Sequence, residues 1–358
     1  MIDSNRIRLA GMTLTEVMVS LLLSSLLTLA LVSLFVSARR SSLQDEQLAT
    51  LQEVGRYALS FLSRELEMVG FMGGFDQVEV IDNAALVSAD QSTLTQDSCL
   101  ALLLDGQAGV THFNNVNEFG QETDHLGQST GRSLPSDCNL GYRRLVKGSD
   151  VVVIRRVKDH SIQERGFSTD NLVPWAVYLS FSDLSGPAVM HRGSDLNAVT
   201  ALQSRSPQRE LETWEFAPQL IYLREQSDVL CTDQGAPPPE LCRIRLKQSG
   251  YGLSPPQCLV DGVERINITF GIDNDRNGMV DQWADVPPTA LAAPIRSAAV
   301  DLLVRSAVLE PHYSDPKIYL LGRDVYDPIQ DGVACTEHHR RTSFHTAVET
   351  RNLWSLRP

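Results

Sequence analysis

The chain has 358 residues, enough for one membrane helix and one large or two small domains. Its 31 Lys and Arg against 44 Asp and Glu give a net charge of −13. This charge disfavours a general nucleic-acid-binding protein, because non-specific affinity for nucleic acid depends largely on cationic side chains that neutralise phosphates.

The N-terminus combines a basic leader with a membrane-length apolar segment. Arg6 and Arg8 precede Gly11, and residues 17–38 contain no charged side chain. As a helix these 22 residues would span about 33 Å, enough to cross the hydrocarbon core of a bilayer. By the positive-inside rule, the basic leader predicts a cytoplasmic N-terminus and export of the chain that follows Arg39.

A single carboxylate, Glu16, stands at the start of the apolar segment. A carboxylate there is costly in lipid unless it has a partner, which predicts a specific role for it. Two other interpretations compete. Glu16 could mark the interfacial edge of an ordinary membrane anchor, or the segment could be a secretory signal cleaved after residues 36–38. The secretory signal is disfavoured because the apolar run is longer than the apolar region of such signals, which usually has about 7–15 residues.

Apolar residues continue at spacings of three and four beyond the basic pair at residues 39–40. They are Leu48, Leu51, Val54, Ala58, Phe61, Leu62, Leu66 and Val69. This periodicity predicts an amphipathic helix with one apolar stripe, and Gly70, Gly73 and Gly74 predict its end. We therefore expect one continuous helix from about residue 13 to residue 69. Two helices broken near Ser41 are the alternative.

From Phe75 onward, short apolar segments rich in β-branched and aromatic residues predict strands. They lie at residues 99–104, 150–154, 175–179, 220–223, 265–270 and 298–304. We expect an antiparallel sheet resting on the amphipathic half of the helix, which is an α+β fold. Residues 106–148 are polar and predict a long surface insertion, partly helical or mobile, and residues 311–332 predict a second exposed connection.

Six cysteines on the exported side predict disulfide bonds, because no pair has the C-x-x-C spacing of zinc or redox motifs. They are Cys99, Cys138, Cys231, Cys242, Cys258 and Cys335, for which 15 pairings exist. We favour Cys99 with Cys138, around a polar stretch, and Cys231 with Cys242, around a Pro-rich loop. That choice leaves Cys258 with Cys335.

One segment has the oxygen-rich spacing of a calcium loop. Asp273, Asp275, Asn277, the Met279 carbonyl and Asp281 match its positions one, three, five, seven and nine, and Gly278 permits the sharp turn. The twelfth position is Ala284 rather than a bidentate glutamate, which excludes a full EF-hand; Asp285 or water could complete the shell. The competing interpretation is a solvated turn held by its own Asn and Asp side chains.

Two common signatures of catalysis are missing from the sequence. It contains no H-E-x-x-H and no glycine-rich nucleotide loop. His338, His339 and His345 could indicate a metal site, but we interpret them as surface residues beside the terminal strand. The sequence therefore favours a non-enzymatic protein.

The stretch from Gly11 to Glu16, with the apolar run after it, resembles the class III signal of type IV pilins and type II secretion pseudopilins. The helix end at residues 58–71 and the segments at residues 295–306 and 340–352 are similar to those of PilW-type minor pilins. The resemblance implies the type IV pilin fold, in which a long N-terminal helix packs on an antiparallel β-sheet domain with long loop insertions. It divides the chain into a leader (1–11), the membrane or filament-core half of the helix (12–38), its amphipathic half (39–70) and a β-rich globular domain (71–358).

The same resemblance implies a processing and assembly route. Prepilin peptidase would cut after Gly11 and N-methylate Met12, and Glu16 would guide docking into the filament. The expected product is a minor pilin that helps to initiate type IV pilus assembly at or near the tip, supporting twitching motility and adhesion. Its expected partners are other minor pilins, the major pilin and the inner-membrane assembly machinery. Before assembly it would sit in the inner membrane with its globular domain in the periplasm.

Two alternatives share these features. A minor pseudopilin of a type II secretion system has the same N-terminal signals. A membrane-anchored, calcium-dependent adhesin would never enter a filament. A third possibility is an anchored hydrolase.

Overall fold

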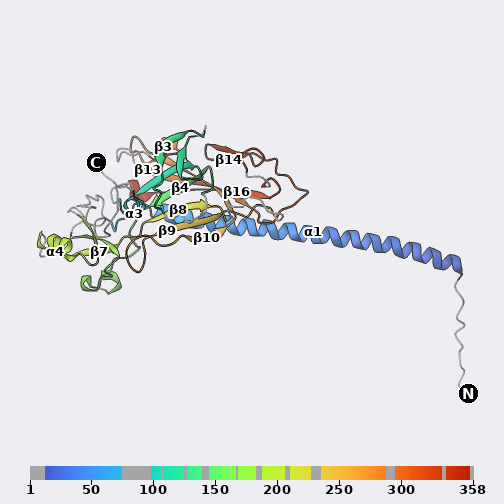
Figure 1. Ribbon diagram of the computed structural model, residues 1–358, viewed down its shortest axis with the longest axis horizontal. Helices are drawn as coiled ribbons and strands as arrows, with labels where there is room; N and C mark the ends of the chain where they lie inside the picture. The colour runs from blue at the N-terminus through green and yellow to red at the C-terminus, as the bar shows by residue number, and fades with distance from the viewer. Residues whose placement is uncertain are drawn as a thin grey trace, which may run out of the picture. The chain divides into compact units, whose positions relative to one another are not determined.

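The computed structural model describes residues 13–74, 98–105, 109–124, 127–138, 145–166, 168–182, 188–205, 210–226, 235–287, 295–332 and 336–354 (Figure 1). The chain divides into two compact units, residues 1–50 and residues 51–358. Gly11 and Met12 lie outside the described residues, as do Cys231 and Cys335.

Helix α1 (Leu14–Glu67) is continuous across residue 41, which confirms one helix rather than two. It is long and apolar enough to cross a membrane by length and composition. In the first unit its side chains are exposed, whereas in the second unit one stripe, including Leu51, Ala58, Leu62 and Leu66, is buried. The burial follows the spacing of three and four read from the sequence.

The second unit contains a seven-stranded antiparallel sheet with the strand order β10-β9-β8-β4-β1-β2-β3 (Figure 1). Its strands are β1 (Val110–Val116), β2 (Gln121–Thr123), β3 (Ser129–Ser133), β4 (Ser149–Ile154), β8 (Gln219–Arg224), β9 (Glu240–Arg245) and β10 (Gln257–Asp261). β4 is buried along its whole length, as expected for a central strand of Val and Ile.

A four-stranded antiparallel sheet has the order β12-β11-β13-β16. Its strands are β11 (Val263–Ile272), β12 (Gln282–Ala284), β13 (Ile295–Arg305) and β16 (Arg341–Glu349). The smaller sheets are β6-β5-β7, from β5 (Val177–Phe181), β6 (Ala188–Arg192) and β7 (Glu212–Glu215), and the hairpin of β14 (Tyr319–Leu321) and β15 (Asp324–Tyr326). The remaining elements are α3 (Cys99–Leu104), α4 (Leu196–Arg205), α5 (Arg351–Trp354), η1 (Gln163–Arg165) and η2 (Thr169–Asn171).

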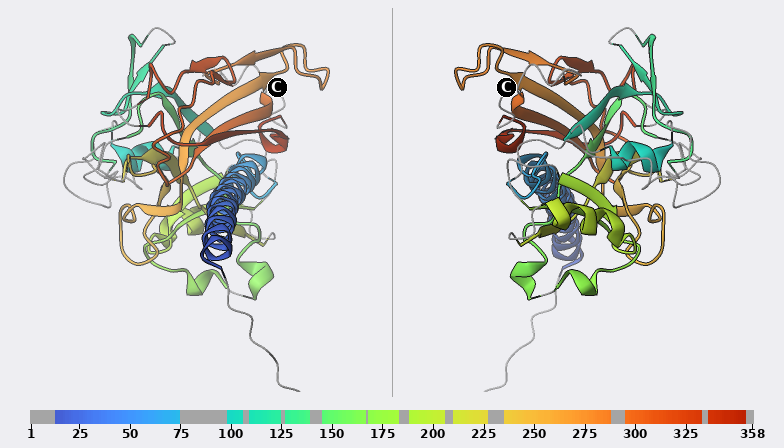
Figure 2. Two further views of the ribbon diagram at one scale, coloured as in Figure 1. Left: turned by 90° about the vertical axis from the view of Figure 1, so that its right-hand side faces the viewer. Right: turned by 90° about the vertical axis from the view of Figure 1, so that its left-hand side faces the viewer.

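The main core joins the C-terminal part of α1 to both large sheets. In both views of Figure 2, the light blue end of the helix lies beside orange and red strands. Ala58, Leu62 and Leu66 belong to one buried cluster with side chains of β4, β8, β11 and β13. Gly55 allows the closest approach, since a Cβ there would lie 2.1 Å from the Phe344 ring of β16. The α+β organisation expected from the sequence is therefore present, with four antiparallel sheets among the described residues in place of one.

Three of the expected elements are wrong. Residues 99–104 form α3, not a strand, and Ser98 caps this helix by accepting a hydrogen bond from the Ala101 N–H. Residues 106–148 are not a surface insertion, because β1 lies inside the seven-stranded sheet with Phe113 and Val116 buried. Residues 311–332 are not merely an exposed connection, because the β14–β15 hairpin buries Tyr319, Leu321 and Tyr326 against Leu303.

Candidate functional site

The N-terminal end of α1 is closed by a capping box. The Glu16 carboxylate accepts hydrogen bonds from the Thr13 N–H (3.0 Å) and the Thr13 hydroxyl (2.9 Å). In return, the Glu16 N–H lies 3.4 Å from the Thr13 Oγ1. This is the reciprocal pattern in which a Thr at the cap and a Glu three residues later satisfy each other's free backbone groups. Glu16 thus has a local structural role besides the assembly role expected of it.

The first unit presents apolar side chains on every face of the helix. Large hydrophobic residues from Leu14 to Phe35 are exposed all round it. Its serines and threonines, including Ser20, Ser24 and Thr28, donate their hydroxyl hydrogens to carbonyls three or four residues earlier. A helix that is apolar all round needs lipid or other helices around it, and internally bonded hydroxyls are compatible with both surroundings.

The predicted calcium loop lies between β11 and β12, closed by a hydrogen bond from the Asp281 N–H to the Ile272 carbonyl (2.9 Å). Asp273 is fully buried, and its two carboxylate oxygens accept the N–H groups of Asn277 (3.1 Å) and Gly278 (2.8 Å). Gly278 has φ +90°, a conformation that glycine adopts at little cost. These hydrogen bonds stabilise the turn.

Three of the predicted ligands converge in this loop. Carboxylate oxygens of Asp273, Asp275 and Asp281 lie within 4.8 Å of one another. Asn277 is turned differently: its Oδ1 accepts the Met279 N–H (2.8 Å) and its Nδ2 donates to Asp275 (2.8 Å). Three clustered carboxylates fit a hard cation such as Ca²⁺, which binds six to eight oxygens. The remaining oxygen ligands would have to come from backbone carbonyls, from Asn277 in another rotamer, or from water.

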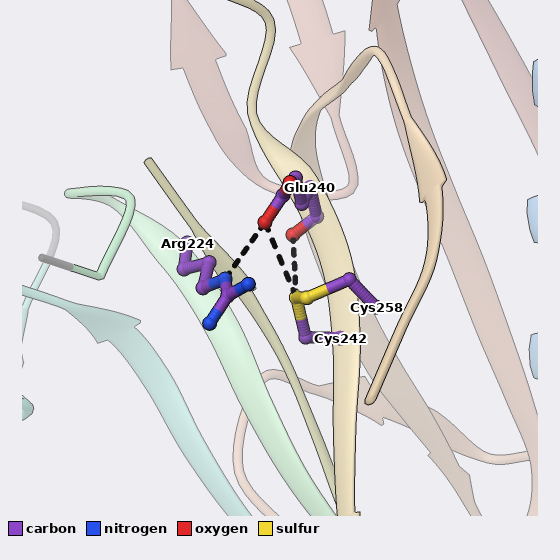
Figure 3. The surroundings of a disulfide bond; sticks show 4 residues. All are labelled: Arg224, Glu240, Cys242 and Cys258. Atoms are coloured by element: carbon purple, nitrogen blue, oxygen red, sulfur yellow. Dashed lines mark hydrogen bonds and ion pairs between the residues drawn. A yellow bond between two sulfur atoms is a disulfide. The ribbon is translucent and has the colours of Figure 1, made fainter. Parts of the chain in front are cut away.

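The structure contains the disulfide Cys99–Cys138, which confirms that pairing. The second pairing is wrong: Cys242 is bonded to Cys258, not to Cys231, so Cys258 is not available to Cys335. The reason is strand register, since Cys242 on β9 and Cys258 on β10 are direct cross-strand partners. Figure 3 shows this bond beside an ion pair between the Arg224 Nε and a Glu240 carboxylate oxygen (2.7 Å).

A buried ionic cluster ties the start of β11 to the start of β16. The Glu264 carboxylate contacts the Arg341 guanidinium at 2.5 and 2.9 Å, and the Arg305 Nε lies 3.3 Å away. The Tyr326 hydroxyl donates to the same carboxylate (3.2 Å). Arg341 also contacts Asp315 at 3.3 Å. Burial alone would raise the pKa of Glu264, but Arg341 and Arg305 outweigh it and lower that pKa.

His339 lies at the edge of this cluster and is fully buried, so the expectation that it is a surface residue is wrong. Its Nδ1–H donates to the Ser306 carbonyl (2.8 Å), and its Nε2 has no hydrogen-bond partner among the described residues. Burial, together with the charges of Arg305 and Arg341, lowers the pKa of His339 to about 4. The folded protein therefore keeps this imidazole neutral.

We expect this histidine to make stability fall in mildly acidic solution. Between pH 6.5 and about 4, the unfolded chain takes up a proton at His339 that the folded chain does not. The free energy of unfolding therefore decreases by up to about 3 kcal/mol as the pH falls through this range. His339→Gln should remove this part of the pH dependence of the unfolding free energy. The control is His345→Gln, whose ring is 62% exposed and bonded to Asp301. Equal pH profiles for the wild type and His339→Gln would contradict the prediction.

Residues 228–352 match the family model described as "Type IV Pilus-assembly protein W" (PilW). This match confirms the resemblance to PilW-type proteins over the C-terminal part of the chain. The matched segment covers about a third of the chain, including β9 to β16, the Asp-rich loop and the buried ionic cluster. It therefore contains β11 and β13, two of the strands that share the main core with the C-terminal part of α1.

Among solved structures, the chain is similar to the type IV-like pilin TTHA1219 from Thermus thermophilus. The alignment has 13% identity and a TM-score of 0.25, and it covers 57% of this chain and 78% of that chain. A search of curated proteins found no match. The chain itself combines a long apolar N-terminal helix with antiparallel sheets, which confirms the α+β class expected from the sequence.

Proposed function

We propose that this protein is a PilW-type minor pilin that helps to initiate type IV pilus assembly and lies at or near the pilus tip. The observation that carries the proposal is helix α1, which runs unbroken from an uncharged, all-round apolar half into a half whose apolar stripe belongs to the main core of the β-rich unit. Such a helix suits a subunit that is first held in a membrane and later packed among the helices of other subunits.

The proposed route begins in the inner membrane, with the β-rich domain in the periplasm. Prepilin peptidase cuts after Gly11 and N-methylates Met12, and Glu16 then guides docking through the charge of its carboxylate. The protein assembles with other minor pilins and the major pilin through the inner-membrane machinery. Its role is structural: it supports pilus formation, twitching motility and adhesion, and catalyses no reaction.

Deletion of the gene tests this proposal against its nearest alternative. Loss of surface pili and twitching, restored by the wild-type gene, supports the minor-pilin role. Normal pili with loss of protein export would instead assign the chain to a type II secretion system. Normal pili and normal export, with loss of surface binding only, would favour the membrane-anchored adhesin.

We further propose that the loop at residues 273–281 binds one Ca²⁺ through Asp273, Asp275 and Asp281, with Asn277 and the Met279 carbonyl as further ligands. The support is the convergence of the three carboxylates, whose mutual repulsion a divalent cation would relieve. Extracellular calcium sites commonly bind with dissociation constants of about 10⁻⁴–10⁻³ M.

Titration of the full chain in detergent with CaCl₂, followed by calorimetry, should show one bound ion per chain in that range. Asp275→Asn should weaken binding at least tenfold, because it removes one anionic ligand at an exposed position and keeps an oxygen that can accept the hydrogen bonds from Asn277. The matched control is Asp261→Asn, an exposed site on β10 away from the loop. No heat of binding at millimolar Ca²⁺, or equal effects of the two substitutions, would show that the loop is a solvated turn.

A further inference from the structure

A cleft of about 780 Å³ opens in the β-rich domain between the ends of several strands. Its walls come from the turn before β4, the residue that follows β8, the Pro-rich approach to β9, the first half of β11 and the β14–β15 hairpin. This volume lies within the range of about 300–1,000 Å³ typical of ligand pockets. It is large enough for several side chains of another polypeptide and far larger than a single ion needs.

The lining of the cleft is acidic. Six carboxylate side chains and four cationic side chains line it. Three of the cations are already engaged. Arg305 donates to the carbonyls of Ala236 and Pro237 and lies against Glu264. These bonds reduce what the cations can offer to a ligand.

Arg265 donates to the Lys147 carbonyl, and its guanidinium lies over the Tyr326 ring, 4.5 Å from the ring centre. Arg323 lies 3.6 Å from an Asp285 carboxylate oxygen. Lys147 is the remaining cation in the lining, and its side chain is exposed. The carboxylates therefore exceed the cations that are free to neutralise them.

Glu225 is the carboxylate best placed to receive a cation. It directly follows β8, lines the cleft and is partly buried. None of the described residues forms a hydrogen bond or an ion pair within 4 Å with its carboxylate. Burial raises the pKa of Glu225 and the nearby Glu264 raises it further, although Arg305 and Arg265 oppose this shift. A cation bound beside this carboxylate would stabilise its charged form.

The hairpin beside Glu225 adds an apolar surface. Leu320 on β14 and Val325 on β15 are cross-strand partners, and they are 71% and 61% exposed. The opposite face of the same hairpin is buried, so these two side chains point outward while Tyr319 and Tyr326 point into the core. Val325 lines the cleft together with Pro237 and Pro239, and Leu320 is its cross-strand neighbour outside the lining. An apolar rim therefore borders an acidic interior.

We propose that this cleft binds a basic segment of a partner polypeptide, with a lysine or arginine beside Glu225 and flanking apolar side chains on Leu320 and Val325. Charge complementarity selects the basic residue, and the volume and apolar rim select a peptide rather than a metal ion. The inference deepens the proposed function, on which it rests for the nature of the partner: it assigns a docking surface for another subunit of the assembly.

The test uses two peptides, acetyl-Val-Lys-Val-Lys-Val-amide and the same peptide with glutamate in place of lysine. Binding to the full chain in detergent is measured by calorimetry at two salt concentrations. We expect the lysine peptide to bind with one-to-one stoichiometry, more weakly at high salt, and the glutamate peptide not to bind. Glu225→Gln should weaken the lysine peptide about tenfold or more, because it removes a charge-assisted hydrogen bond. Val325→Ser should weaken it severalfold.

The control is Asp261→Asn, which changes the net charge equally at an exposed position outside the cleft. Equal losses for Glu225→Gln and Asp261→Asn would overturn the proposal, because they would indicate general attraction to an acidic protein. Displacement of the peptide by 1 mM CaCl₂ would overturn it in favour of a cation site, and so would a lack of binding. If the peptide fails to bind while gene deletion still abolishes piliation, the cleft assignment falls and the minor-pilin function stands.

Discussion

Replacing Glu16 by glutamine is expected to abolish entry of the protein into filaments while leaving the start of α1 folded. The carboxylate of Glu16 both closes a capping box with Thr13 and carries the charge proposed to guide docking. Glutamine can fill the same position in a capping box, so the substitution removes the charge alone. The measurement is the amount of this protein in purified pili, relative to the amount in the membrane.

Two further variants separate capping from docking. Thr13→Ala weakens the cap by about 1 kcal/mol but keeps the carboxylate, so it should still enter filaments. Glu16→Ala loses both functions and should fail as completely as Glu16→Gln. If Glu16→Gln assembles normally and Glu16→Ala does not, the residue acts through the helix cap, and its assembly role through charge is contradicted.

Replacing Glu264 by alanine is expected to cost about 3–5 kcal/mol of unfolding free energy. The substitution leaves the guanidinium groups of Arg341 and Arg305 buried without the carboxylate that neutralises them. Removing one partner of a buried pair costs far more than the pair contributes as a whole, because the remaining charge is desolvated and uncompensated. Urea unfolding of the full chain in detergent, followed by tryptophan fluorescence, measures the loss.

Glu310→Ala provides the matched control. Glu310 also forms a two-contact pair with an arginine, at 2.6 and 2.9 Å from Arg340, but both side chains are partly exposed to water. We expect this variant to lose about 1 kcal/mol or less. Similar losses for the two variants would show that burial does not set the importance of the Glu264 cluster.

The long helix and the Asp-rich loop could be predicted because their signals are local in sequence. Spacings of three and four between Leu48 and Val69 define one helix face, and the structure buries that stripe from Leu51 onward. The sharp turn at Gly278 and the carboxylates around it lie within nine consecutive residues. The convergence of Asp273, Asp275 and Asp281 needed no information from distant parts of the chain.

Strand β1 was missed because its buried face includes polar residues. His112 is fully buried with its Nε2 2.9 Å from an Asp150 oxygen, and the Asn115 N–H donates to the same carboxylate (2.9 Å). In the sequence these residues interrupt the apolar pattern of a strand, and their partner stands 35 or more positions away. The prediction of a strand at residues 99–104 was wrong for another reason, because a short apolar run is compatible with either a strand or a helix.

The ionic cluster and the second disulfide could not be predicted because tertiary pairing decides both. Glu264 forms an ion pair with Arg341, which lies 77 positions away in the sequence. Cys242 meets Cys258 because β9 and β10 pair in one register, whereas distance along the chain favoured Cys231 as its partner. Sequence patterns locate elements well, but they do not give the register between strands.

Mass spectrometry of the N-terminal peptide, from protein isolated from the membrane of its native host, tests the central claim most directly. The minor-pilin account predicts a chain that begins at N-methylated Met12, because prepilin peptidase cuts after Gly11. A chain that begins at Arg39 would identify the apolar segment as a cleaved secretory signal. A chain that still begins at Met1 would identify an ordinary anchor, and either result would contradict the account.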